Sequence, residues 1–194
     1  IESGSHEKVD RASRWEKMFF GALLAAYVVA EIIVSTRMAL FLRREKNFSL
    51  VLSSILTSLF FASLLAGRII FIFWRPSLKV KTQMVLSLVG TLLCVLIGIF
   101  ATPWGLVLSG LTMAPFYPLS MTAAGRLFST QVSSVMAYVV MLTSLFLSTM
   151  HLGFGALTDL LGIRLALLIS PFFGGLSLLM LLSYSRIFKR PFHF

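Results

Sequence analysis

Glu31 is the residue of this chain best placed to do chemistry, because it lies near the middle of the apolar run 18–42. A run of about 20 apolar residues spans a bilayer. An ionised side chain at the centre of such a span costs about 2.5 to 3.5 kcal/mol, so acids found there commonly belong to a pathway, a partner contact or a proton relay. Tyr27 and Ser35 lie four residues before and after Glu31, and helical spacing puts all three on one face.

This polar stripe predicts a cavity beside the helix. Burial disfavours the charged form of a carboxyl group, so we predict that Glu31 binds and releases a proton as the cavity opens to each side. The alternative is a structural Glu31 that hydrogen-bonds to a neighbouring helix and holds two spans in register.

Two prolines interrupt another apolar run, 103–125. Pro115 and Pro118 lack amide hydrogens, so a helix must bend or unwind there. Irregular backbone at membrane depth is tolerated only against protein or a water-filled cavity, and broken helices are where transporters expose carbonyl groups to solute. A kink that serves packing alone is the alternative. The predicted cavity-lining residues are Tyr27, Glu31, Ser35, Thr112, Phe116 and Tyr117.

Three other charged residues are predicted to act in gating. Arg68 lies close to the end of its apolar run, where its long side chain can contact a neighbouring helix end or anchor the span. Asp159 and Arg164 lie in a short predicted loop, where we expect them to pair and to stabilise one conformation. Arg37 lies about 120° around the helix from Glu31 and is predicted to be an interfacial anchor or a partner for substrate anions.

The chain as a whole is predicted to be an all-α membrane protein. Hydrophobic residues fill 58% of its 194 positions, against about 45–50% in soluble domains. The apolar runs lack the alternation of membrane barrel strands. The predicted spans are 18–42, 48–74, 83–101, 103–125, 131–156 and 165–186, which together form a lobe over 18–186.

The flanking segments are predicted from their polarity. Because the sequence begins with Ile1, residues 1–17 are expected to be a cytoplasmic linker between domains or a cut terminus, and 187–194 a cytoplasmic tail.

Basic residues predict the orientation, because they favour the cytoplasmic side of short loops. The side that holds both termini carries Lys8, Arg11, Arg14, Lys17, Arg75, Lys79, Lys81, Arg126, Arg186, Lys189 and Arg190. The opposite side carries Arg43, Arg44, Lys46 and Arg164. Both termini are therefore predicted to be cytoplasmic, in a bacterial inner (plasma) membrane.

Several function classes find no support in the residues. The net charge of +10 comes from basic residues scattered among short loops, so no nucleic-acid partner is predicted. His151 has no second ligand at metal spacing, so no metal or cofactor is predicted and His151 is expected to pack or to hydrogen-bond. The clustered polar groups of a membrane enzyme are missing, as is a G-x-x-x-x-G-K-[ST] nucleotide loop.

Spans two and five share a pattern of small and hydroxylated residues along one face. Each pattern ends near a glycine and a charge, at Gly67-Arg68 in one span and at Gly155 to Asp159 in the other. These two ends would lie on opposite membrane faces. We therefore predict that the six helices form two inverted three-helix repeats, the building unit of many transporters.

Two sets of residues resemble a known family. The stretch Gly155-Ala-Leu-Thr-Asp159-Leu-Leu-Gly162-Ile-Arg164 is similar to the Gly-x-x-x-Asp-x-x-Gly-x-Arg loop of the major facilitator superfamily. The fucose permease-like sugar:proton symporters are resembled more loosely, by Tyr27-Val-Val-Ala-Glu31, Phe48-Ser49, Ser58-Leu59-Phe60, Gly67-Arg68 and Phe116-Tyr117-Pro118.

The resemblance implies that the chain is the C-terminal six-helix half of a secondary transporter. It would move a small polar solute across the bilayer by alternating access, in import or export, with Glu31 as the proton-coupling residue. Its partner would be an N-terminal six-helix lobe of the same transporter or a second copy of this chain. A membrane scaffold or assembly subunit that moves no solute is the alternative.

Overall fold

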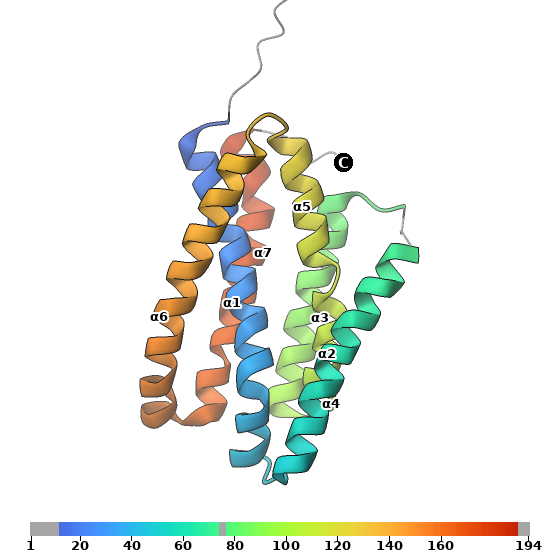
Figure 1. The fold of residues 1–194 in the computed structure, drawn as a ribbon, viewed down its shortest axis with the longest axis vertical. Helices are drawn as coiled ribbons and strands as arrows, with labels where there is room; N and C mark the ends of the chain where they lie inside the picture. The colour runs from blue at the N-terminus through green and yellow to red at the C-terminus, as the bar shows by residue number, and fades with distance from the viewer. Residues whose placement is uncertain (1–11, 74–76, 190–194) are drawn as a thin grey trace, which may run out of the picture.

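A computed structural model gives the fold of residues 12–73 and 77–189 (Figure 1). Within these ranges the regular structure is entirely α-helical, without β-strands. The helices are α1 Arg14–Arg44, α2 Leu50–Phe73, α3 Val80–Phe100, α4 Trp104–Met113, α5 Phe116–Leu127, α6 Val132–Leu167 and α7 Ile169–Phe188. Most of the predicted linker 1–17, the last residue of the predicted span 48–74 and most of the predicted tail 187–194 lie outside the described residues.

In the described part, six helical stretches are long and apolar enough to cross a membrane. They are α1, α2, α3, the stretch Trp104–Leu127 that contains α4 and α5, α6, and α7. The predicted class, an all-α integral membrane protein with six apolar helices, is confirmed. The start of α1 and the end of α7 lie at the same end of the bundle, together with the end of α2, the start of α3 and the connection from α5 to α6 (Figure 1).

Two helix ends differ from the predicted spans. The first helix begins at Arg14 because Ser13 caps it: the Ser13 hydroxyl accepts the Glu16 amide hydrogen at 3.1 Å. The fifth span continues past its apolar run, and α6 consists of two helical stretches that meet at a kink at the non-helical Gly162 and reach Leu167. Gly162 has φ 80°, a conformation that glycine adopts without steric cost.

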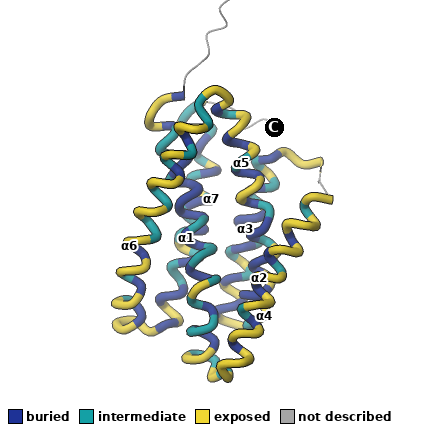
Figure 2. The backbone as a smooth tube through the Cα atoms, viewed as in Figure 1, coloured by how far each residue is buried: buried dark blue, intermediate teal, exposed yellow. Residues whose placement is uncertain are grey.

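The helices pack around α1, which is the most buried of them (Figure 2). Helices α6 and α7 pack along α1, and α2 packs along part of it. On the other side of the bundle α4 packs between α2 and α3, while α3 also contacts α7. Helices α2 and α6 are exposed over much of their length (Figure 2).

Small residues allow these helices to approach closely, as is common in membrane bundles. Where α4 meets α2, a Cβ added at Gly110 would lie 2.5 Å from the Phe60 carbonyl oxygen and would also meet the Ser63 hydroxyl. Helix α7 is joined to α1 by buried serines. Ser170 donates to the Ala30 carbonyl at 2.9 Å, and Ser177 donates to the Leu23 carbonyl at 3.0 Å.

We expect Gly110→Ala to lower the free energy of unfolding by about 1–3 kcal/mol, the usual cost of overpacking. The added methyl group would have to push α2 away from α4. Thermal unfolding of detergent-solubilised protein measures the effect. Gly125→Ala is the matched control, because a Cβ at Gly125 meets no atom within 4 Å. Equal melting temperatures for the two variants would contradict the packing described here.

Candidate functional site

The break in the fourth span leaves helix-end carbonyl groups that side chains satisfy. Helix α4 ends at Met113 and α5 begins at Phe116, and the last carbonyls of a helix have no intrahelical partner. The Ser87 hydroxyl, from α3, donates to the Thr112 carbonyl at 2.5 Å. The Tyr27 hydroxyl, from α1, donates to the Met113 carbonyl at 2.8 Å. The break is therefore held from two neighbouring helices.

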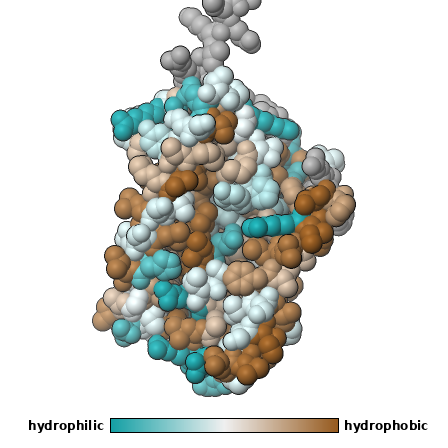
Figure 3. Space-filling view, viewed as in Figure 1, coloured by the Kyte–Doolittle hydropathy of each residue, from teal (hydrophilic) through white to brown (hydrophobic). Residues whose placement is uncertain are grey.

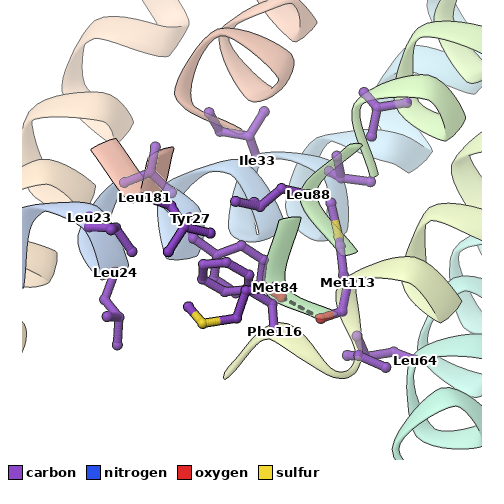
Figure 4. Packing of buried hydrophobic residues seen from close by; sticks show 14 of the residues in the cluster. Leu23, Leu24, Tyr27, Ile33, Leu64, Met84, Leu88, Met113, Phe116 and Leu181 are labelled. Atoms are coloured by element: carbon purple, nitrogen blue, oxygen red, sulfur yellow. Dashed lines mark hydrogen bonds between the residues drawn. The ribbon is translucent and has the colours of Figure 1, made fainter. Parts of the chain in front are cut away.

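Tyr27 connects this break to Glu31. Its hydroxyl oxygen lies 2.6 Å from Glu31 Oε2, one helical turn away on α1. Its ring stacks on Phe116, the first residue of α5, with centroids 4.2 Å apart and an angle of 30° between the rings (Figure 4). Only 1% of Tyr27 is exposed. The tyrosine therefore contacts both sides of the break and the mid-span acid at once.

Glu31 itself is half-buried, near the middle of α1. Among the described residues it makes no ion pair, and Tyr27 is its hydrogen-bond partner. Arg68 is exposed on α2 and forms no ion pair with Glu31 in the described part. The site thus joins an acid and a phenol by a hydrogen bond, without a direct charge pair.

The six predicted cavity-lining residues occupy different environments. Glu31 and Ser35 are half-buried, and Tyr117 is 41% exposed, so these three reach the surface of the lobe. Tyr27 and Phe116 lie in the core beneath them.

Thr112 faces α3 instead of the surface beside Glu31. Its hydroxyl lies 3.2 Å from that of Thr91, and it donates to the Ser109 carbonyl at 3.0 Å. The difference arises because the rotation of α4 about its own axis turns Thr112 towards α3. The positions of the two prolines do not determine this rotation.

The predicted gating residues are not brought together. Arg164 pairs with Glu45, just after α1, at 3.7 Å, and its guanidinium group lies 5.0 Å from the centre of the Phe100 ring. Asp159 is exposed and forms no hydrogen bond or ion pair with a described residue. The expected Asp159–Arg164 pair is therefore replaced by an interhelical pair. The physical reason is the non-helical Gly162, which redirects the chain between the two charges.

One polar cluster was not predicted as a site. Arg37, expected to be an interfacial anchor, lies between α1 and α6, with Nη2 3.3 Å from His151 Nδ1 and its guanidinium group 4.7 Å from the centre of the Phe154 ring. Arg37 Nε is buried without a hydrogen-bond partner among the described residues. The only indication of this cluster in the sequence was that Arg37 and His151 each lie inside an apolar run.

Polar side chains gather on one face of the lobe. Figure 3 shows hydrophilic side chains at mid-height of the face that α6, α1 and α2 present, between hydrophobic ones. Exposed polar residues of α6 include Ser144, Ser148 and His151, and those of α2 include Ser54, Ser58 and Arg68.

A cavity of about 620 Å³ between α6 and α7 has a different character. It is lined mainly by apolar residues such as Leu145, Phe146 and Phe172, and none of the predicted site residues lines it.

No group of three or more His, Cys, Asp or Glu side chains within residues 12–73 and 77–189 has the arrangement of a metal site. No protein-family model, curated protein or solved structure matches this chain. The fold and the six apolar helices define an integral membrane protein of the all-helical class.

Proposed function

We propose that this chain is one lobe of a secondary transporter, which moves a small polar solute by alternating access and couples the movement to protons through Glu31. The observation that carries the proposal is the contact of a half-buried mid-span acid, through Tyr27, with the end of the broken helix α4. The proposal includes the architecture of the major facilitator superfamily, which the sequence resembles.

The cost of placing Glu31 in a membrane supports a functional role. An acid in a span is retained at a cost of about 2.5 to 3.5 kcal/mol when ionised, so intramembrane acids commonly serve transport. Glu31 is half-buried and has no cationic partner within the described residues that would hold it permanently ionised. A carboxyl group in this setting can bind and release a proton.

The broken fourth span supports a solute path at the same place. Pro115 and Pro118 cannot donate backbone hydrogen bonds to the carbonyls of Leu111 and Ala114. Membrane transporters commonly place such discontinuous helices at their solute sites, where the freed carbonyls become ligands. Tyr117, exposed next to this break, is the side chain best placed to contact a solute.

The packing of the helices supports two inverted repeats. Helix α1 packs against the fifth and sixth spans, α6 and α7, while the fourth span packs against the second and third, α2 and α3. If spans one, two and three are exchanged with spans four, five and six, the contacts of the first span become those of the fourth. The contact between α3 and α7 maps onto itself.

The polar face indicates a partner other than lipid. Arg68, Ser148 and His151 are exposed, and hydrocarbon does not solvate charged or polar groups. We propose that a second six-helix lobe, either the N-terminal half of the same transporter or another copy of this chain, covers this face across a water-filled crevice. We further propose that both termini are cytoplasmic, because basic residues favour that side of short loops, and that the lobe belongs to a bacterial inner membrane.

Cysteine accessibility tests the crevice. In a Cys94→Ala background, Tyr117→Cys should react with a membrane-impermeant maleimide from one side of the membrane at a time, and the reactive side should depend on the transport state. Phe116→Cys is the matched control, because Phe116 is fully buried, and it should stay protected. Protection of position 117 from both sides under all conditions would favour a scaffold without transport activity.

A further inference from the structure

The hydroxyl group of Tyr27 has two neighbours but only one hydrogen. Its oxygen lies 2.6 Å from Glu31 Oε2 and 2.8 Å from the Met113 carbonyl oxygen. A phenol donates one hydrogen bond and accepts others, whereas a backbone carbonyl only accepts. Both short contacts are full hydrogen bonds only when Glu31 is protonated. The carboxyl group then donates to Tyr27, and Tyr27 donates to Met113; Figure 4 shows the second of these bonds.

Loss of the proton rearranges this chain of hydrogen bonds. The proton passes from the Glu31 carboxyl group to water, and the resulting carboxylate can only accept. A hydrogen bond to a carboxylate is about twice as strong as one between neutral groups. The single Tyr27 hydrogen therefore turns to Glu31, and the Met113 carbonyl loses its donor.

The lost bond lies where the backbone can respond. Met113 is fully buried, and a buried carbonyl without a donor is costly. The nearest donor along the chain is the amide of Tyr117, four residues later, which is the regular helical partner of that carbonyl. Rebuilding this bond draws the start of α5 towards the end of α4 and changes the bend of the fourth span.

We propose that Tyr27 is a positioning residue that converts the proton occupancy of Glu31 into a change of conformation at the break between α4 and α5. This inference rests on the proposed function and adds the path by which proton binding reaches the solute site. The path runs from α1 to α4 through one hydroxyl group.

The titratable and charged groups of the helices that pack on α1 make their described contacts with residues other than Glu31. On α2, Arg68 is exposed and forms no ion pair with Glu31 in the described part. Helix α4 carries no titratable side chain. On α6, His151 contacts Arg37, and on α7, Tyr184 donates to Glu16 at 2.7 Å, about four helical turns from Glu31. These contacts leave Tyr27 as the link between Glu31 and the break.

A nitroxide spin label at position 117 tests the inference in the full-length protein reconstituted in liposomes, with Cys94→Ala and Tyr117→Cys. The ratio of the two spectral components should change about tenfold over the titration of Glu31, which corresponds to about 1.4 kcal/mol. The infrared band of the protonated carboxyl group, assigned by its loss in Glu31→Gln, follows Glu31 directly. Its midpoint should coincide with that of the label.

Tyr27→Phe should separate the two readouts. The phenylalanine ring still stacks on Phe116, and the infrared band of Glu31 still titrates. The ratio of the two spectral components of the spin label, however, should change less than twofold. Tyr184→Phe is the matched control, because it removes a hydroxyl from another buried tyrosine–glutamate pair, and it should keep the full response.

Two results would overturn the inference. They differ in whether the proposed proton coupling by Glu31 is also overturned. If Tyr27→Phe keeps the tenfold response while Glu31→Gln abolishes it, proton coupling by Glu31 stands and the hydroxyl path is wrong. If Glu31→Gln also keeps the response, or if the parent protein shows none, both the path and the proton coupling in the proposed function are wrong.

Discussion

Glu31→Gln should abolish the accumulation of solute that a pH gradient drives, while solute exchange across the membrane continues. Glutamine keeps the size and the hydrogen-bonding ability of the protonated side chain, so the lobe can still change conformation. It has no proton to release. For one proton per solute, a gradient of one pH unit supports about a tenfold concentration ratio, equal to about 1.4 kcal/mol. In the variant this ratio should fall to about one.

Uptake by proteoliposomes from a panel of radiolabelled small polar solutes, sugars first, measures both activities. Accumulation is followed under an imposed pH gradient, and exchange is followed with solute on both sides. Glu16→Gln is the matched control, because Glu16 is also a buried acid of α1 that accepts from a tyrosine, Tyr184, but it lies at the end of the helix. Accumulation that survives in Glu31→Gln would remove Glu31 from coupling.

The second large effect is expected from a straightened fourth span. The double variant Pro115→Ala, Pro118→Ala restores amide hydrogens for the carbonyls of Leu111 and Ala114, and a proline in a helix interior costs about 3 kcal/mol. A continuous helix should therefore form through positions 104–127. The Met113 carbonyl would then bond to the amide of Tyr117, and Tyr27 would lose an acceptor. We expect exchange to fall at least about tenfold, while thermal stability stays equal or rises.

Pro171→Ala is the control for this experiment. Pro171 lies in the first turn of α7, where its missing amide hydrogen would have no helical acceptor, so its replacement should change neither exchange nor stability much. Exchange at the parent rate in the double variant would show that the break is only a packing feature.

The sequence predicted the spans well because a membrane imposes a simple rule: helices of sufficient length must be apolar. It also placed the interruption of the fourth span, because Pro115 and Pro118 have a local effect that depends on no distant residue. The spacing of Tyr27 and Glu31 put them one turn apart, and a hydrogen bond of 2.6 Å joins them.

The features that could not be predicted depend on how helices rotate against one another. Thr112 turns towards Thr91 on α3, and Arg164 pairs with Glu45, which precedes it by more than a hundred residues. The contact between Arg37 and His151 is of the same kind. Periodicity defines a face of each helix, but the neighbour of that face is selected by packing in three dimensions.

The end of the fifth span is a second kind of difference. The predicted fifth span stops at 156, yet the first helical stretch of α6 continues past the charged Asp159 as far as the break at Gly162. The backbone hydrogen bonds of a helix do not require apolar side chains once the chain leaves the hydrocarbon. The bounds of a membrane span and the bounds of its helix are therefore separate quantities.

The packing of α1 has a consequence for biosynthesis. The helices that cover it most, α6 and α7, are synthesised more than a hundred residues later, so α1 enters the bilayer before its neighbours exist. Its most polar group already has a partner at that stage, because Tyr27 belongs to the same helix as Glu31. The nascent span thus shields its own carboxyl group until the last helix inserts and the serines of α7 reach the α1 backbone.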